Sequence, residues 1–134
     1  MHTDVRFTDN SEEVRTALEN AVQRALTRCG LQAEGYAKEK VPVDTGNLRN
    51  SISNKVVDGE QSVYIGTNNE YAAYVELGTG KYTSGGRPDP WVYRDSKGNW
   101  HHTHGQRAQP YLKPAVADHK GTYQNIIKDE LENA

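Results

Sequence analysis

Apolar residues recur at steps of three and four between about Ser11 and Lys40, which predicts one long amphipathic helix. The positions that form this stripe are Val14, Leu18, Ala21, Val22, Ala25, Leu26, Cys29, Ala33, Tyr36 and Ala37. Gly30 lies inside the pattern and is a candidate kink or break, because glycine costs roughly 1 kcal/mol in a helix interior. Pro42 ends the run, since the residue before a proline is pushed toward extended geometry.

The pattern then changes to short apolar runs that are typical of strands. The segments NSISNKVV and QSVYIGT flank Asp58 and Gly59, a pair that favours a tight turn, so residues 50–66 are expected to form a β-hairpin. The next segment, NNEYAAYVELGTG, is typical of a short helix or irregular turn that closes at Gly78. Glycine is favoured just after a helix ends.

A second hairpin, rich in aromatic residues, is predicted within residues 81–109. Trp91 and Tyr93 alternate along one arm, Trp100 and His102 alternate along the other, and the polar segment DSKGN joins the arms. Cross-strand aromatic pairs of this kind contribute roughly 0.2–1 kcal/mol each.

Helical spacing returns over residues 112–133, with Pro114 in the first turn, where a missing backbone N–H is tolerated. A long helix, a small antiparallel sheet with an inserted aromatic hairpin, and a C-terminal helix together predict an α+β fold. The length suits one domain, and we expect residues 1–134 to form it.

The composition predicts a thin hydrophobic core. Leu, Ile, Val and Phe supply only 23 of the 134 residues, and there are eight tyrosines. A tyrosine can be half-buried at an interface with its hydroxyl satisfied. We therefore expect the chain to complete its burial against other subunits.

Charge is unevenly distributed along the chain. The net charge is −2, but residues 81–120 hold seven Lys or Arg against three Asp, so this segment is basic and the remainder is acidic. Basic residues with interleaved aromatic residues could grip single-stranded nucleic acid, or dock on an acidic protein surface, where Trp, Tyr and Arg are common anchors. A protein partner is favoured because the chain as a whole is acidic. The contacting segment is expected to be residues 88–107. The interface candidates are Trp91, Tyr93, Arg94, Trp100, His102 and Tyr111.

The triplet Asp44-Thr45-Gly46 has the same letters as the active-site triplet of aspartic proteases. Such an enzyme needs two carboxylates about 3 Å apart that share a proton, and a homodimer could supply both. Here the triplet follows a long helix and a proline, and Leu48 and Ile52 are spaced as in a helical turn. The favoured interpretation is a structural joint, in which Asp44 or Thr45 caps a short turn and Gly46 relieves the backbone.

Other chemistry is weakly indicated. His101, His102 and His104 have some potential as metal ligands, but zinc takes three or four ligands, so solvated or interface histidines are favoured and no metal or cofactor is expected. The single cysteine, Cys29, cannot form an internal disulfide, which fits a reducing compartment. The first residues lack the basic and apolar regions of a secretion signal, and no apolar run is long enough to span a membrane, so neither feature is expected. The chain has no nucleophile elbow, P-loop, dinucleotide fingerprint or HExxH motif, so an enzyme is not expected.

Three stretches together carry a resemblance to a known family. VPVDTGNLRNSI (41–52), YAAYVELGTG (71–80) and AQPYLKPAV (108–116) resemble, in this order and spacing, the minor tail-component or neck (head–tail joining) proteins of tailed bacteriophages and prophages. The aromatic insertion before AQPYL is similar to a common form in that family.

The resemblance implies a non-enzymatic virion protein, assembled in the host bacterial cytoplasm. Such proteins form rings at the head–tail junction or the top of the tail and bind other connector and tail proteins. Double-stranded DNA passes through their channel without sequence-specific binding. The residues that the resemblance places in its structural motifs are Pro42, Asp44, Thr45, Gly46, Leu48, Glu76, Gly78, Thr79, Pro110 and Pro114. The alternatives are a tail terminator or another minor tail ring protein and, from a different class, a nucleic-acid-binding module.

Overall fold

The computed structural model describes residues 8–42, 46–70, 72–94 and 97–134. The elements are α1 (Ser11–Lys40), α2 (Gly46–Ser51), β1 (Ser53–Val57), η1 (Asp58–Glu60), β2 (Ser62–Gly66), α3 (Ala72–Leu77), η2 (Gly80–Tyr82), β3 (Trp91–Arg94), β4 (Trp100–Thr103), α4 (Leu112–Ala117) and α5 (Lys120–Glu132). The predicted α+β class is confirmed.

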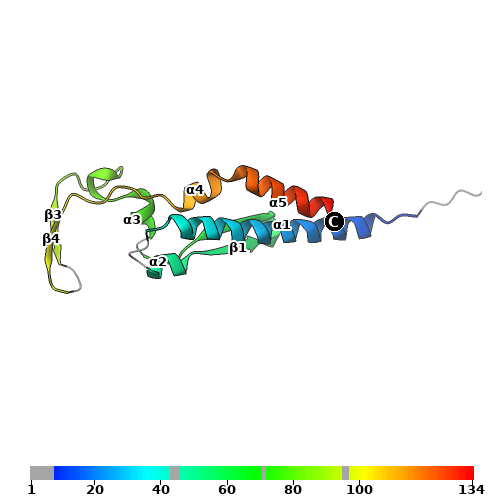
Figure 1. Ribbon diagram of the computed structural model, residues 1–134, viewed down its shortest axis with the longest axis horizontal. Helices are drawn as coiled ribbons and strands as arrows, with labels where there is room; N and C mark the ends of the chain where they lie inside the picture. The colour runs from blue at the N-terminus through cyan, green and yellow to red at the C-terminus, as the bar shows by residue number, and fades with distance from the viewer. Residues whose placement is uncertain (1–7, 43–45, 71, 95–96) are drawn as a thin grey trace, which may run out of the picture.

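Helix α1 is the axis of the fold, and its bounds match those that the sequence pattern predicts. The β1–β2 hairpin packs along one flank of α1, and α4 and α5 pack along another (Figure 1). The buried residues of α1 are all small: Ala21, Ala25, Cys29, Gly30, Ala33 and Ala37. Small side chains at this spacing let both neighbours approach the helix closely, so the molecule is thin and elongated.

Gly30 is a candidate kink or break in the sequence, and helix α1 passes through it without a break. The glycine serves close packing instead. A Cβ atom at this position would lie 2.7 Å from Asn54 Oδ1 and 2.7 Å from Val63 Cγ2, both on the β1–β2 hairpin. Packing against this hairpin therefore outweighs the helix propensity that glycine gives up.

Replacing Gly30 with alanine is expected to destabilise the protein by about 1–3 kcal/mol, the usual cost of overpacking. Gly35→Ala is the matched control, because it lies in the same helix and nothing lies within 4 Å of its added Cβ. That substitution should stabilise the protein by about 0.5–1 kcal/mol through helix propensity alone. Urea denaturation measures the change in the free energy of unfolding of each variant. Equal changes for the two variants would contradict the packing argument.

The first hairpin differs from its prediction at both ends. Its strands begin at Ser53 instead of residue 50, because the preceding residues form α2. The strands close at the pair Val57↔Ser62, which leaves a four-residue connection in place of a two-residue turn. That connection is η1 followed by Gln61 in the left-handed region at φ 51°.

The main hydrophobic cluster lies where the end of α1 meets α2, α3 and α4. Its buried members are Ala37, Val41, Leu48, Ile52, Ala72, Tyr111 and Ala115. Leu48 and Ile52, from the segment expected to form a joint, are among the largest fully buried side chains. Asp44 and Thr45 lie outside the described residues, and Gly46 begins α2.

The predicted C-terminal helix is two helices, α4 and α5, with a break at Asp118 and His119. The Tyr123 hydroxyl donates a hydrogen bond to the Ala115 carbonyl, and the His119 ring stacks on Tyr36 with centroids 3.5 Å apart. Both contacts lie at this break, and α4 and α5 each pack on α1.

Side chains fix the register of α5 on α1. Arg24 Nε lies 2.9 Å from Glu130 Oε2, and Arg28 Nη1 lies 2.8 Å from Asp129 Oδ2 and 3.1 Å from Glu130 Oε1. The hydrogen bond from Arg24, with that from Arg28, lowers the pKa of Glu130. Among the described residues, no helix is long and apolar enough to cross a membrane.

Candidate assembly site

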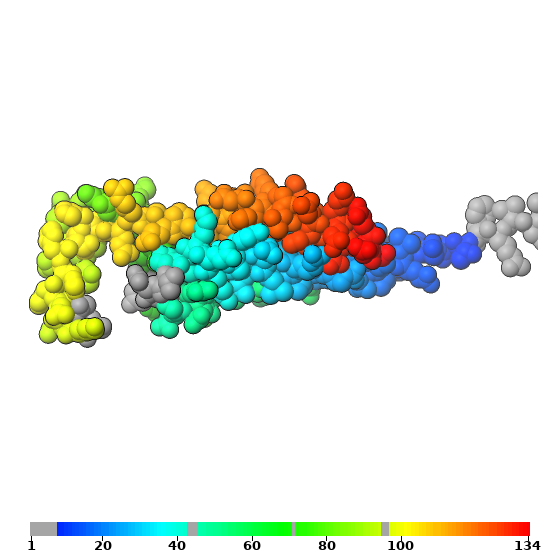
Figure 2. Space-filling model, viewed as in Figure 1, coloured from blue at the N-terminus to red at the C-terminus, as the bar shows by residue number. Residues whose placement is uncertain are grey.

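The most exposed aromatic surface lies on the second hairpin, β3–β4, which stands away from the body at one end of the molecule (Figures 1 and 2). The strands are antiparallel, with Trp91 opposite Thr103 and Arg94 opposite Trp100. The aromatic hairpin predicted from the sequence is therefore present, with its strands at the expected arms.

The two faces of this hairpin carry different side chains, since residues directly opposite in an antiparallel pair share a face. The first face holds Trp91, Tyr93, His101 and Thr103, and the second holds Val92, Arg94, Trp100 and His102. On the first face the Tyr93 and His101 rings stack 5.2 Å apart. On the second, the Arg94 guanidinium lies 6.0 Å from the centroid of the Trp100 ring.

Exposure is the notable property of the hairpin. Trp100 is 68% exposed, Val92 is 60% exposed and Tyr93 is 46% exposed. An isolated two-stranded hairpin is marginally stable in water, and exposed aromatic residues of this size are typical of contact surfaces. The hairpin therefore presents anchors without a core of its own.

Cations accompany the aromatic rings across the projecting segment. The Arg87 guanidinium lies 5.8 Å from the centroid of Trp91. The Tyr82 ring has Lys81 Nζ at 5.2 Å and the Arg107 guanidinium at 5.1 Å. The basic and aromatic residues that interleave in the sequence therefore contact one another in the structure, with cations beside aromatic rings.

The base of the projecting segment is closed by a pairing that we call the clamp, formed by residues 75–81 and 104–113. Thr79 N donates to Gln106 O at 2.9 Å and Lys81 N to His104 O at 3.2 Å. Gln109 N donates to Val75 O at 2.8 Å, and Gln106 N donates to Thr79 Oγ1 at 2.8 Å. Both ends of the segment are thus joined to each other and to the body.

Two glycines make this close pairing possible. Gly80 has φ +60°, and a Cβ there would lie 2.2 Å from His104 O. Gly105 has φ +109°, and a Cβ there would lie 2.2 Å from Thr79 O. Gly78, expected to follow a helix end, does so after α3 with φ +81°.

Glu76 connects the clamp to α4. Its Oε2 accepts hydrogen bonds from Tyr111 N at 2.7 Å and Leu112 N at 3.0 Å, and its Oε1 accepts from Lys113 N at 2.9 Å. These N–H groups lie at the start of α4, which has no side-chain cap from Tyr111 at its N-cap position. Pro114 lies in the first turn of α4, as its position in the sequence suggests.

Sequence reasoning did not pair Glu76 with the segment QPYLKPA. The two lie 35 to 37 residues apart in the chain, beyond the reach of local patterns. One signal was present: α4 begins after residues that offer no capping side chain, while an acidic residue precedes the glycine in ELGTG. The resemblance placed Glu76 in a turn, but it lies in the last turn of α3. Pro110, just before Tyr111, is exposed.

Tyr111 was expected at an interface, and the structure places it in the core instead. Its side chain is 0% exposed, and its hydroxyl donates to Ala72 O at 3.4 Å. Burial, with the nearby Glu76 carboxylate, raises the pKa of the Tyr111 phenol. The clamp draws the start of α4 beneath α3, so Tyr111 cannot reach a partner.

The histidine cluster is divided between the two faces of the hairpin. The His102 and His104 rings contact edge to face at 5.4 Å, while His101 stacks on Tyr93. Within the described ranges, no three potential ligands from His, Cys, Asp and Glu come together as a metal site.

Burial raises the pKa of the Cys29 thiol, which lies on α1 away from the β3–β4 hairpin.

Comparison with known proteins identifies the family. Residues 6–78 match the family model described as "Bacteriophage HK97-gp10, putative tail-component". No curated protein and no solved structure matches the chain. The matched region runs from the start of the fold to the first glycine of the clamp and covers more than half of the sequence. The chain therefore belongs to the HK97 gp10-like family of bacteriophage tail components.

Proposed function

We propose that this chain is a non-enzymatic structural protein of the head–tail junction, in the neck or tail-completion position, and that its copies form a ring that joins the head to the tail. Membership of a tail-component family supports a structural role in the virion. The whole chain would act as one virion domain, assembled in the host cytoplasm alongside other connector and tail proteins.

The observation that carries this proposal is the exposed β3–β4 hairpin on its clamp. The body contributes a thin core, whose largest fully buried side chains are Tyr111, Leu48, Ile52 and Val41. The hairpin carries exposed aromatic side chains with a cation beside Trp100, and it projects from the body (Figure 2). Such a surface gains stability when a partner covers it, as a neighbouring subunit in a ring would.

The charge balance supports a channel that DNA passes through without sticking. The chain has a net charge of −2, and capture of double-stranded DNA depends on release of counterions by clustered Lys and Arg. An acidic bore would let DNA slide without sequence-specific contacts. A cryo-EM map of the virion that shows a bore lined by Lys and Arg would contradict this part of the proposal.

Replacing Trp91 and Trp100 together with alanine is expected to abolish self-association and to leave the helix content unchanged. Aromatic anchors at interface centres contribute about 2 kcal/mol or more each, so the apparent dissociation constant should rise at least about 100-fold. Light scattering over a concentration series measures the mass of the assembly, and far-ultraviolet circular dichroism measures the helices.

Tyr64→Ala is the matched control, because Tyr64 is also an exposed strand aromatic, at 56%, but lies on the other hairpin. It should leave assembly intact. Unfolding of the double variant would show that the two tryptophans belong to the core. Unchanged assembly with loss of salt-dependent DNA binding would favour the nucleic-acid-binding alternative.

A further inference from the structure

The start of α1 is a second surface that no other described element covers, at the opposite end of the molecule from the β3–β4 hairpin. Helix α1 runs past the end of α5 and past the tip of the first hairpin (Figure 1). Val14 is 49% exposed and Leu18 is 45% exposed. With Val22 they lie at steps of four, on one stripe of the helix, and together with Gln61 they line an open hollow of about 450 Å³.

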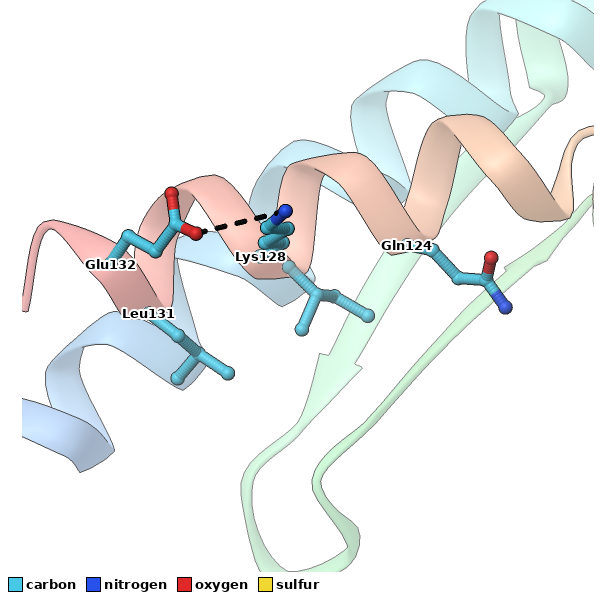
Figure 3. A pocket seen from close by; sticks show the side chains of 5 residues that line it. Gln124, Lys128, Leu131 and Glu132 are labelled. Atoms are coloured by element: carbon cyan, nitrogen blue, oxygen red, sulfur yellow. Dashed lines mark ion pairs between the residues drawn. The ribbon is translucent and has the colours of Figure 1, made fainter.

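The end of α5 also carries exposed aliphatic side chains. Ile127 is 41% exposed and Leu131 is 40% exposed, and both line a second hollow of about 440 Å³. Figure 3 shows Leu131 beside Glu132, whose carboxylate pairs with Lys128 at 3.9 Å. The two hollows place exposed aliphatic side chains at the same end of the molecule.

The overhanging part of α1 is acidic. Residues 9–22, which we call the acidic end, carry four carboxylates (Asp9, Glu12, Glu13 and Glu19) and one cation, Arg15. Residues 81–107, which contain the β3–β4 hairpin, carry five cations (Lys81, Arg87, Arg94, Lys97 and Arg107) and two carboxylates (Asp89 and Asp95). The acidic end has a net charge of −3, and residues 81–107, at the other end of the molecule, have a net charge of +3.

This charge pattern selects the occupant of the apolar stripe. Two acidic ends would repel each other, as would two hairpins, because like charges brought together at an interface cost free energy. An acidic end and a hairpin attract, and both offer apolar side chains that lose water on contact. The two surfaces lie at opposite ends of an elongated chain (Figures 1 and 2), so one copy cannot join them to each other.

We infer that the acidic end of one copy receives the β3–β4 hairpin of a second copy. Trp100 and Val92 pack on Val14 and Leu18, and Arg94, on the same hairpin face, lies toward Glu19. This inference rests on the proposed function and names the surface that receives the hairpin. Because donor and acceptor are different patches, the contact is heterologous, and it forms a closed ring when the rotation between copies closes.

The test uses two variants that are each blocked on one side only. Trp100→Ala removes the donor anchor, and Val14→Ser with Leu18→Ser removes the acceptor stripe. These side chains are all exposed, so both variants should keep the fold. Each alone is expected to remain a single chain by light scattering, with association weakened by roughly 30-fold or more, the change that corresponds to loss of one anchor. Their equimolar mixture is expected to form a dimer and nothing larger, because it contains one intact donor and one intact acceptor.

Leu31→Ser is the matched control, since Leu31 is 57% exposed on the same helix but lies outside the acidic end. It should assemble like the wild type. If the acceptor variant assembles normally while Trp100→Ala does not, the hairpin docks elsewhere, which overturns this inference and leaves the proposed function standing. A mixture that stays monomeric, or a wild-type chain that never self-associates, also overturns the inference.

Discussion

Glu76→Ala is expected to lower the free energy of unfolding by about 2–4 kcal/mol, because it removes the acceptor for three backbone donors at once. The carboxylate accepts from Tyr111, Leu112 and Lys113, and the negative charge also faces the positive end of the α4 dipole. Without it, these N–H groups at the start of α4 lose their partner beside a buried tyrosine. Thermal and urea denaturation measure the loss.

Two companion variants separate this cap from a general effect of charge. Glu76→Gln keeps one carbonyl oxygen and should show an intermediate loss. Glu39→Gln removes an exposed carboxylate near the end of α1 and should change stability by less than about 0.5 kcal/mol. Equal effects at Glu76 and Glu39 would mean that α4 does not depend on the cap.

Gly80→Ala is expected to open the clamp. The added Cβ would lie 2.2 Å from His104 O and 2.9 Å from Gly105 Cα, and backbone atoms cannot give way as a flexible side chain can. The expected cost is about 2–5 kcal/mol, the sum of left-handed strain and overpacking. Because the clamp joins the projecting segment to the body, hydrogen exchange of the Thr79 and Lys81 amides should accelerate strongly.

Gly85→Ala measures the backbone-strain part of that cost alone, so its difference from Gly80→Ala gives the steric part. Gly85 also has a positive φ, +76°, but nothing lies within 4 Å of a Cβ built there. It should cost only the left-handed strain of about 1–2 kcal/mol and leave the exchange of Thr79 and Lys81 unchanged. Similar losses for the two variants would mean that backbone strain, and not the close approach in the clamp, sets the requirement for glycine.

Sequence patterns predicted the parts of the fold that depend on neighbouring residues. The stripe from Val14 to Ala37 gave the bounds of α1 because a helix of 30 residues repeats its period many times. Alternation around Trp91 and Trp100, on either side of a polar turn segment, located β3 and β4. In both segments, local spacing and tertiary structure agree.

The errors fall where a distant contact decides the local conformation. The β1–β2 hairpin packs closely on Gly30 within an unbroken helix. The C-terminal helix breaks where Tyr123 contacts Ala115 and His119 stacks on Tyr36. Tyr111 looked like an exposed anchor because it lies in a basic, aromatic stretch. Its burial depends on Glu76, which is 35 residues away in the chain.

The candidate site was predicted in composition and not in geometry. Trp91, Tyr93, Arg94, Trp100 and His102 were chosen as contact residues, and they lie on the projecting hairpin. Their division between two faces, with Trp91 and Trp100 on opposite sides, depends on the strand register. The acceptor stripe of Val14 and Leu18 was counted as ordinary helix periodicity, because the pattern does not show where the rest of the body ends.

The packing of α5 on α1 has a consequence for the order of synthesis. Arg24 and Arg28 leave the ribosome about a hundred residues before their partners Asp129 and Glu130, a delay of roughly 5–20 s at ordinary translation rates. During that interval the flank of α1 that α5 later covers is exposed, because α5 has not yet been synthesised. Each chain therefore reaches its mature shape only after translation of α5, so contacts that need the folded body form only between complete chains.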